Sequence, residues 1–219
     1  MKRLMLALLV VGATVTMIGM VTLANFSDTE ESTGNTATAG TLDLLVGTGS
    51  DGPATCNSPV DDPPTEFTVT DMAPGGSAEQ TPCLKNDGSI AASDATLKYT
   101  ITADLDNLCT EPEDDIPDGS CSGAGSGELD SNLDVDTWVD DGAGTGGVRC
   151  DNVKNGSESS VALLTGKLDA ISGSTRSLGV GVGAGAFICV GIELSVDGSV
   201  GNIIQSDSVT FTKKYGLTQ

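Results

Sequence analysis

The chain has 219 residues, of which 29 are glycine, 31 are acidic and 10 are basic, so its formal charge at pH 7 is −21. This charge excludes nucleic-acid binding, because the phosphate backbone requires a basic surface. The sequence contains no histidine, which excludes Ser-His-Asp and Cys-His catalysis and every histidine-based zinc site. It also contains no G-K-[ST] phosphate loop, and we therefore do not expect an enzyme.

The chain begins with a predicted signal peptide, residues 1–24. Lys2 and Arg3 form a basic start, residues 4–21 are an uninterrupted apolar run, and the small residue Ala24 suits cleavage after it. An uncleaved membrane anchor is the alternative, because about 18 apolar residues nearly span a bilayer. In both cases the rest of the chain is expected to be secreted, and only the leader meets the membrane. Removing Lys2 and Arg3 with the leader leaves 31 acidic and 8 basic residues, a formal charge of −23.

Residues 25–40 form a polar N-terminal segment, and the predicted strands follow it. Continuous or alternating apolar residues predict six strands. These strands span Thr41–Val46, Glu66–Met72, Ala95–Ala103, Asn132–Val139, Phe187–Val196 and Asp207–Tyr215. In the last of them Val209, Phe211 and Lys213 share one face, although less cleanly than the apolar residues of the other strands.

The stretches between these strands are rich in glycine, proline and acidic residues, which favour turns. Three of them are predicted to be loops: residues 47–65, 111–127 and 140–147. The pattern at residues 161–171 fits either a short helix or a strand. Short strands with irregular connections predict an all-β fold, a jelly-roll-like β-sandwich, and residues 41–219 are enough for one such domain.

Six cysteines follow the leader, an even number that suits disulfides in an exported protein. None lies in a C-x-x-C pair, so neither a zinc knuckle nor a redox site is expected. We predict three structural disulfides, with the pairing left open, among Cys56, Cys83, Cys109, Cys121, Cys150 and Cys189. Cys109 and Cys121 stand out as the two ends of a short loop, whose closure would contribute roughly 3 kcal/mol.

An acidic stretch predicts a calcium site. Asp140, Asp141, Asp151 and Asn152 are expected to cluster at the end of one strand. Calcium takes about six to eight oxygen ligands, several of them carboxylates. The spacing does not match an EF-hand, and a solvated acidic loop is the alternative.

Several motifs, taken in order, resemble those of one family. Residues 24–30 read A-N-F-S-D-T-E, and T-A-G-T-L-D-L follows at 38–44. Residues 72–75 read M-A-P-G, residues 84–91 read L-K-N-D-G-S-I-A, and G-N-I-I-Q-S-D-S-V-T-F stands at 201–211. This set resembles the TasA/camelysin family, secreted β-sandwich proteins that build extracellular fibres. The W-V-D-D-G and C-D-N-V segments around the predicted calcium site look like an acidic loop of archaeal, bundling-pilin-like members.

The resemblance implies a structural subunit of extracellular, cell-surface filaments or pili in a biofilm matrix. Members are similar to donor-strand fibres, in which the N-terminal segment of one subunit adds a strand to the next subunit. In this chain the donor-strand segment would be residues 25–40, and the donor itself would run from Asn25 to about Ser32. It would begin with Asn25, Phe26, Ser27, Asp28 and Thr29, and Phe26 would be its one large apolar anchor. The implied partner is a second copy of the chain, joined head to tail.

Two other functions remain to be weighed. Camelysin members have been classed as metallopeptidases, but this sequence holds no zinc ligand set, so that activity is not expected. The alternative to a filament is a monomeric cell-surface or binding module that calcium stabilises, with no other cofactor. Microscopy of the purified protein would distinguish fibres from isolated globules.

Overall fold

The computed structural model describes the chain from Gly40 onward, with gaps. The described residues are 40–50, 55–61, 66–70, 72–106, 127–142 and 149–219. The predicted leader lies outside them, as does all of the predicted donor segment except Gly40. No described helix is both long and apolar enough to cross a lipid bilayer.

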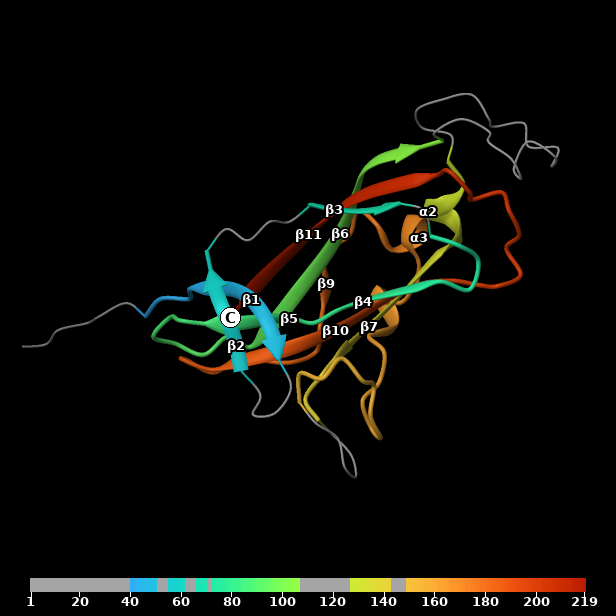
Figure 1. Ribbon diagram of the computed structural model, residues 1–219. Helices are drawn as coiled ribbons and strands as arrows, with labels where there is room; N and C mark the ends of the chain where they lie inside the picture. Colours follow the sequence, from blue (N-terminus) through green and yellow to red (C-terminus); the bar gives the residue numbers. More distant parts are fainter. Residues whose placement is uncertain (1–39, 51–54, 62–65, 71, 107–126, 143–148) are drawn as a thin grey trace, which may run out of the picture. The chain divides into compact units, whose positions relative to one another are not determined.

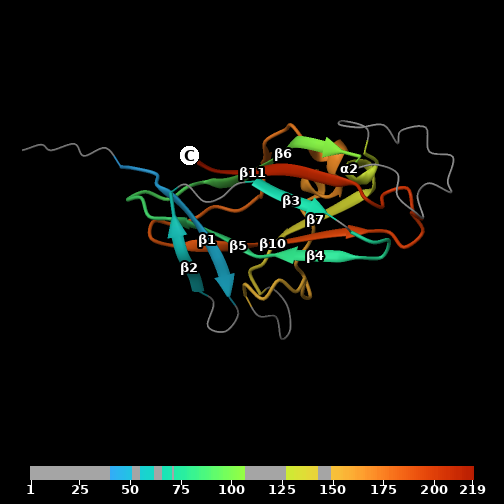
Figure 2. The same ribbon diagram turned by 45° about the horizontal axis from the view of Figure 1, so that its top comes forward.

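Antiparallel strands build two sheets that lie in two layers (Figure 1 and Figure 2). The strands are β1 (Leu44–Ser50), β2 (Thr55–Val60), β3 (Glu66–Thr70), β4 (Ser77–Gln80), β5 (Pro82–Asn86), β6 (Asp94–Leu105), β7 (Leu133–Val139), β8 (Gly166–Lys167), β9 (Arg176–Ser177), β10 (Phe187–Val196) and β11 (Ser208–Thr218). One sheet has the order β2-β1-β5-β10-β7-β8, with β4 also paired to β10, and the other has the order β3-β11-β6-β9. Short helical turns occur at α2 (Leu129–Asn132), η2 (Ala162–Leu164) and α3 (Leu168–Ile171). The predicted all-β sandwich is confirmed.

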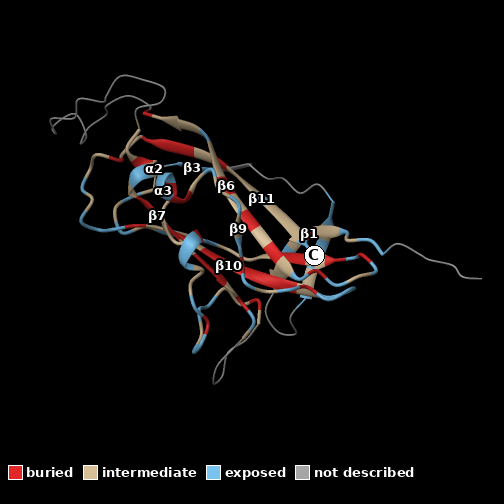
Figure 3. Cartoon of the chain, turned by 180° about the vertical axis from the view of Figure 1, so that it is seen from behind, coloured by how far each residue is buried: buried red, intermediate tan, exposed pale blue. Residues whose placement is uncertain are grey.

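The core lies between the two sheets. Leu97 and Tyr99 of β6 and Val209 and Phe211 of β11 are at most 1% exposed. The rings of Tyr99 and Phe211 meet edge to face, with centroids 6.0 Å apart. The Tyr99 hydroxyl forms a 2.8 Å hydrogen bond with the hydroxyl of buried Thr137, so this polar atom is paired inside the core. Figure 3 shows the buried residues along β10 and the first half of β11.

The long apolar strands are where the sequence predicts them. β10 has the predicted bounds, and β7 begins one residue later. β6 extends beyond both predicted ends, whereas β11 begins one residue later and ends three residues later than predicted. Residues 161–171 contain η2, β8 and α3, so helix and strand both occur there. These strands are recognisable from sequence because each buries an apolar face of its own.

The prediction of a loop at residues 47–65 is wrong, because this stretch contains the end of β1 and all of β2. β1 begins later than predicted, and the sequence pattern predicts neither β4 nor β5. β2 and β4 have no fully buried side chain, and β5 begins with a proline. Such strands form because a neighbour pairs with them, and their own apolar pattern is weak. The other two predicted loops lie largely outside the described residues.

Asn86, in the L-K-N-D-G-S-I-A motif, is fully buried and joins three segments. Its amide nitrogen donates to the carbonyl oxygens of Ile90 (2.8 Å) and Val182 (3.0 Å). Its oxygen accepts the N–H of Gly88 at 3.1 Å. A Cβ atom at Gly88 would lie 2.2 Å from the carbonyl oxygen of Thr41, so the close approach requires glycine. The motif therefore fixes the path of the chain into β1.

Candidate functional site

The last strand, β11, is covered along only part of one edge. On one side β6 pairs with it along its whole length, from Ser208 to Thr218. On the other side β3 pairs with it from Ser208 to Thr212. No other described strand pairs with the remaining edge, Lys214–Thr218, which we call the uncovered edge. The N–H and C=O groups of such an edge are a template for a strand from another chain.

A groove of about 600 Å³ adjoins this part of β11. Its lining comes from β1, β2, β4 and the start of β5 in one sheet, from β11 of the other sheet and from Asn152. Val46 and Val60 contribute apolar surface, and Val60 is 45% exposed. Gln80, Lys213 and Tyr215 contribute polar groups. The groove is therefore suited to a ligand of mixed polarity.

The inward face of β11 changes where β3 ends. Val209 and Phe211 are buried in the core, but Lys213 and Tyr215, the next two side chains of that face, line the groove. The Lys213 ammonium donates a hydrogen bond to the side-chain oxygen of Gln80. Burial lowers the pKa of Lys213 to about 8, because the charged form loses hydration. The groove thus brings a positive charge into the space between the sheets.

Two polar groups in the groove have no hydrogen-bond partner among the described residues. One is the buried hydroxyl of Tyr215, whose pKa is raised by burial and also by nearby Tyr99. The other is the side-chain amide of Asn152, of which neither the nitrogen nor the oxygen is paired. A buried polar atom without a partner costs about 1–3 kcal/mol. A peptide backbone, which carries donors and acceptors, would satisfy both groups.

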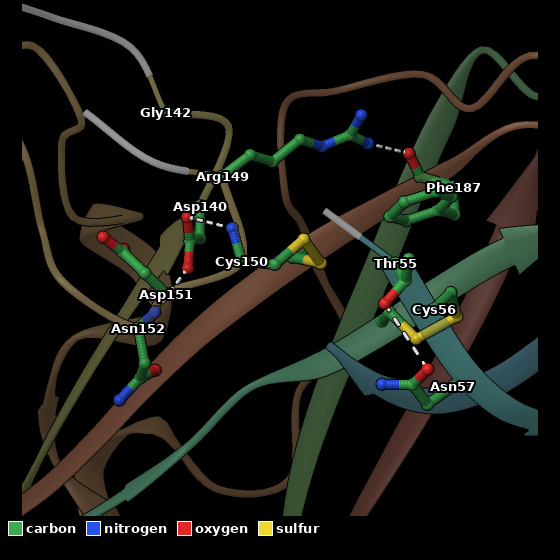
Figure 4. Close-up of a disulfide and its surroundings, with 12 residues drawn as sticks. Thr55, Cys56, Asn57, Asp140, Gly142, Arg149, Cys150, Asp151, Asn152 and Phe187 are labelled. Atoms are coloured by element: carbon green, nitrogen blue, oxygen red, sulfur yellow. Dashed lines mark hydrogen bonds between the residues drawn. A yellow bond between two sulfur atoms is a disulfide. The ribbon is translucent and has the colours of Figure 1, made fainter. Parts of the chain in front are cut away.

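The loop that carries Asn152 is held by the buried carboxylate of Asp140 (Figure 4). Asp140 is 0% exposed, and its two oxygens accept the backbone N–H groups of Cys150 (2.7 Å) and Asn152 (2.8 Å). Burial raises the pKa of Asp140, although both hydrogen bonds act in the opposite direction. Asn152 has a φ angle of 58°, a left-handed conformation that asparagine tolerates better than most residues. Asp140 therefore positions the Asn152 side chain at the groove.

Glu158, which the sequence analysis does not single out, ties the same loop together. Glu158 is 8% exposed, and its two oxygens accept the N–H groups of Gly142 and Asn155, each at 2.7 Å. Asp151 accepts the N–H of Val153 at 2.9 Å within its own turn. Glu158 lies in a uniformly polar stretch, so no local pattern marks it as buried.

The four predicted calcium residues lie in or beside this loop. Asp140 and Asp151 accept backbone amides, Asp141 is exposed, and Asn152 lines the groove. Within the described ranges, no group of three or more Asp, Glu, Cys or His side chains is arranged to hold a metal ion. Calcium binding at this loop stays a prediction.

Two disulfides attach β2 and the loop that carries Asn152, both of which line the groove, to the centre of the larger sheet. Cys56 of β2 bonds to Cys83 of β5, and Cys150 of the acidic loop bonds to Cys189 of β10. Cys83 and Cys189 stand opposite each other in the β5–β10 pair, and both are 0% exposed. β2 and the acidic loop are thereby fixed to neighbouring strands. The remaining two predicted disulfide residues lie outside the described part of the chain: Cys109 and Cys121.

A serine and a lysine near β7 belong to a small polar network around Asp136. Lys154 donates a hydrogen bond to the hydroxyl of Ser160 and forms a 2.8 Å salt bridge with Asp136. Burial alone would raise the pKa of Asp136, but hydrogen bonds from Lys154, Ser160 and Thr165 outweigh it and lower the pKa. The Lys154 ammonium group is thus engaged by a carboxylate and by a hydroxyl of the same subunit.

One comparison with known proteins gives a match. The family model described as camelysin metallo-endopeptidase matches residues 1–116 of the 219. No curated protein matches the chain. The metal that this description implies does not fit the residues present, because the sequence lacks histidine and no described cysteine is free.

The matched region includes the predicted leader, the segment that follows it and the L-K-N-D-G-S-I-A motif built around Asn86. It covers more than half of the chain, and the all-β sandwich agrees with the fold expected from the motifs. The chain therefore belongs to the TasA/camelysin family.

Proposed function

We propose that the chain is a structural subunit of extracellular filaments, in which the N-terminal segment of one copy adds a strand to the next copy. Membership of the TasA/camelysin family indicates a secreted biofilm-matrix protein, and the proposal refines this role. The observation that carries it is the uncovered edge of β11 next to the groove. Strand addition needs such an edge, because the incoming backbone pairs with it while alternate side chains fill pockets.

The proposed donor is the segment Asn25–Ser32. An extended chain advances about 3.3 Å per residue, so the uncovered edge Lys214–Thr218 spans about 17 Å and the donor is long enough to cover it. Phe26 is the large apolar side chain of the donor, and Val46 and Val60 offer it apolar surface. Burying Phe26 would contribute about 1.5–3 kcal/mol, so backbone pairing must supply much of the remaining contact energy.

The geometry of this contact leads to a filament. The donor of one copy would occupy the acceptor groove of another. An assembly of any length therefore keeps a free donor at one end and a free acceptor groove at the other. Such a head-to-tail contact propagates without closing. The two disulfides beside the groove support the proposal, because a preformed acceptor loses less conformational freedom on binding.

A structural role is proposed in preference to peptidase activity. The sequence has no histidine, and the ammonium group of Lys154, beside Ser160, already forms a salt bridge with Asp136. The described cysteines are all in disulfides. These residues offer no activated nucleophile or base for peptide hydrolysis.

Deleting residues 25–32 tests the proposal. The deletion is expected to abolish filaments in negative-stain microscopy and to leave a monomer with the β-sheet signal in circular dichroism, since every described strand remains. Phe26→Asp is expected to act similarly, because burying an unpaired charge costs several kcal/mol. Thr36→Asp, which adds the same charge to the N-terminal segment but beyond the proposed donor strand Asn25–Ser32, is the matched control and should still assemble. Filaments from the shortened chain would contradict strand donation by this segment.

A monomeric surface module that calcium stabilises is the second candidate. Asp151 and Glu158 lie close enough to Asp140 to help raise its pKa, and a bound cation would offset that repulsion. Thermal unfolding with calcium and with a chelator tests this candidate. A midpoint that a chelator leaves unchanged would argue against a structural ion. Isolated globules from the intact chain at every salt and calcium concentration would favour the module over the filament.

A further inference from the structure

Three of the eight basic residues that follow the predicted leader lie at the part of β11 that does not pair with β3. They are Lys98 of β6 and Lys213 and Lys214 of β11. Three other lysines each have a carboxylate partner at 2.6–2.8 Å: Lys85 with Asp87, Lys154 with Asp136 and Lys167 with Asp134. A local gathering of positive charge in so acidic a chain needs a physical reason.

On the outer face of the sheet, Lys98 and Lys214 stand directly opposite each other in the β6–β11 pair. Their side chains point away from the core, because the flanking residues Leu97 and Tyr99 are fully buried within it. Like charges directly opposite in a sheet are destabilising. Neither lysine forms an ion pair within the described ranges. A carboxylate placed between them would relieve this repulsion.

On the inner face, Lys213 places a third positive charge in the groove. Its ammonium group has three donors, so it can keep its hydrogen bond to Gln80 and also donate to an added carboxylate. The Tyr215 hydroxyl lies in the same groove and can donate as well. Glu79 is the one acidic residue of the groove lining, and its side chain is exposed to solvent. Both faces of this edge thus favour an acidic ligand.

The proposed donor segment carries the complementary charge. All its charged residues are acidic, and they are Asp28, Glu30 and Glu31. Alternate side chains of a strand point to opposite faces. Asp28 and Glu30 therefore share the face of Phe26, and Glu31 lies on the other face.

Building on the proposed function, we propose that Lys98, Lys213 and Lys214 recognise the acidic donor segment of a second copy. With Phe26 in the groove, a carboxylate on the same face reaches Lys213, and Glu31 reaches the lysine pair outside. The donor contains more polar residues than a strand that docks through apolar contacts alone, and this recognition accounts for its three acidic residues. It also offsets the repulsion between two strongly negative subunits.

Exchanging charges between donor and acceptor tests the recognition. Lys214→Glu and Glu31→Lys are each expected to raise the critical concentration for filament formation about tenfold at fixed salt. The chain with both changes is expected to return to within about threefold of the natural value, because the pair is restored with reversed sign. Pelleting of filaments over a dilution series measures these concentrations. Absence of rescue in the double variant would overturn the pairing.

A matched control separates local recognition from net charge. Lys98→Gln with Lys214→Gln removes the same charge as Lys85→Gln with Lys167→Gln, but the control lysines already have partners in their own subunit. Only the first pair is expected to weaken assembly, by about threefold or more. Equal effects from both pairs would overturn the proposal. Circular dichroism verifies that each variant is folded.

A peptide with the sequence Asn25–Ser32 provides a second readout on the intact chain. Added during assembly, it is expected to shorten filaments by occupying free grooves. A peptide with Asp28→Asn, Glu30→Gln and Glu31→Gln is expected to need about tenfold more for the same effect. Equal potency of the two peptides would overturn the recognition. Filaments from the chain that lacks residues 25–32, in contrast, would overturn the proposed function as well.

Discussion

The two halves of β11 differ both in their edge and in their inward face. In the first half, Ser208–Thr212, β3 pairs with the edge, and Val209 and Phe211 fill the core. In the second half no described strand covers the edge, and Lys213 and Tyr215 line the groove before Leu217 packs against the core again. Among the described residues, the pairing with β3 thus stops just before Lys213 enters the groove. Single substitutions in the first half of β11 are accordingly expected to change the stability of the subunit, and those in the second half are expected to change assembly.

Phe211→Ala is expected to have the largest effect on stability. Phe211 is 1% exposed and packs against Tyr99, so removing its ring should leave a cavity and lower the free energy of unfolding by about 3–5 kcal/mol. Urea unfolding measures the loss, provided that the disulfides stay oxidised. Lys213→Met, two residues further on, is the comparison and should cause no such loss. A loss below about 1 kcal/mol for Phe211→Ala would show that the first half of β11 is not a core strand.

Asp140→Ala is expected to come next. The change leaves the N–H groups of Cys150 and Asn152 without their acceptor, which should lower the free energy of unfolding by about 1–3 kcal/mol. Assembly should weaken too, since Asn152 would lose its position at the groove. Asp141→Ala, at the exposed neighbouring carboxylate, should stay within about 0.5 kcal/mol. Equal effects of the two changes would contradict the role assigned to Asp140.

Lys213→Met is expected to raise stability and to weaken assembly. The pKa of Lys213 is about 8 in the folded chain, against an ordinary value of 10.5, so between these values the unfolded chain binds a proton that the folded chain does not. The natural chain therefore loses stability as pH falls from 10.5 to 8, and the methionine variant does not. After allowance for solvent screening, the variant should be more stable by about 1 kcal/mol at pH 7.

The difference between Lys213→Met and the natural chain should shrink as pH rises from 8 to 10.5. Urea unfolding at pH 7 and at pH 10.5 measures it. A difference that is constant across this range would mean that the ammonium group carries no burial cost.

Tyr215→Phe is expected to have the smallest effect. Its hydroxyl is buried without a partner among the described residues, so removing it should leave the free energy of unfolding unchanged or raise it by less than about 1 kcal/mol. Filament formation should weaken slightly if the donor strand bonds to this hydroxyl. A clear loss of monomer stability would indicate that the hydroxyl is paired within the subunit.

The parts of the fold that were predictable are those in which a strand carries its own apolar face. β10 could be given its bounds because its apolar run is buried over most of its length. β2 and β5 could not, since they contain few apolar residues and depend on pairing with β1 and, for β5, also with β10. Of the candidate site, sequence reasoning reached Asn152 only as a calcium ligand, and it reached Lys213 only as an imperfect member of an apolar face.

By itself the sequence determined the excess of negative charge, the absence of histidine and the set of motifs that marks the family, and it predicts the signal peptide. These are properties of composition and local order, and folding does not alter them. Only the tertiary structure decided that Lys98 and Lys214 stand opposite each other, that Asp140 and Glu158 hold one loop, and which part of β11 no described strand covers. Strand register and loop closure join residues far apart in the chain, so no local pattern can encode them.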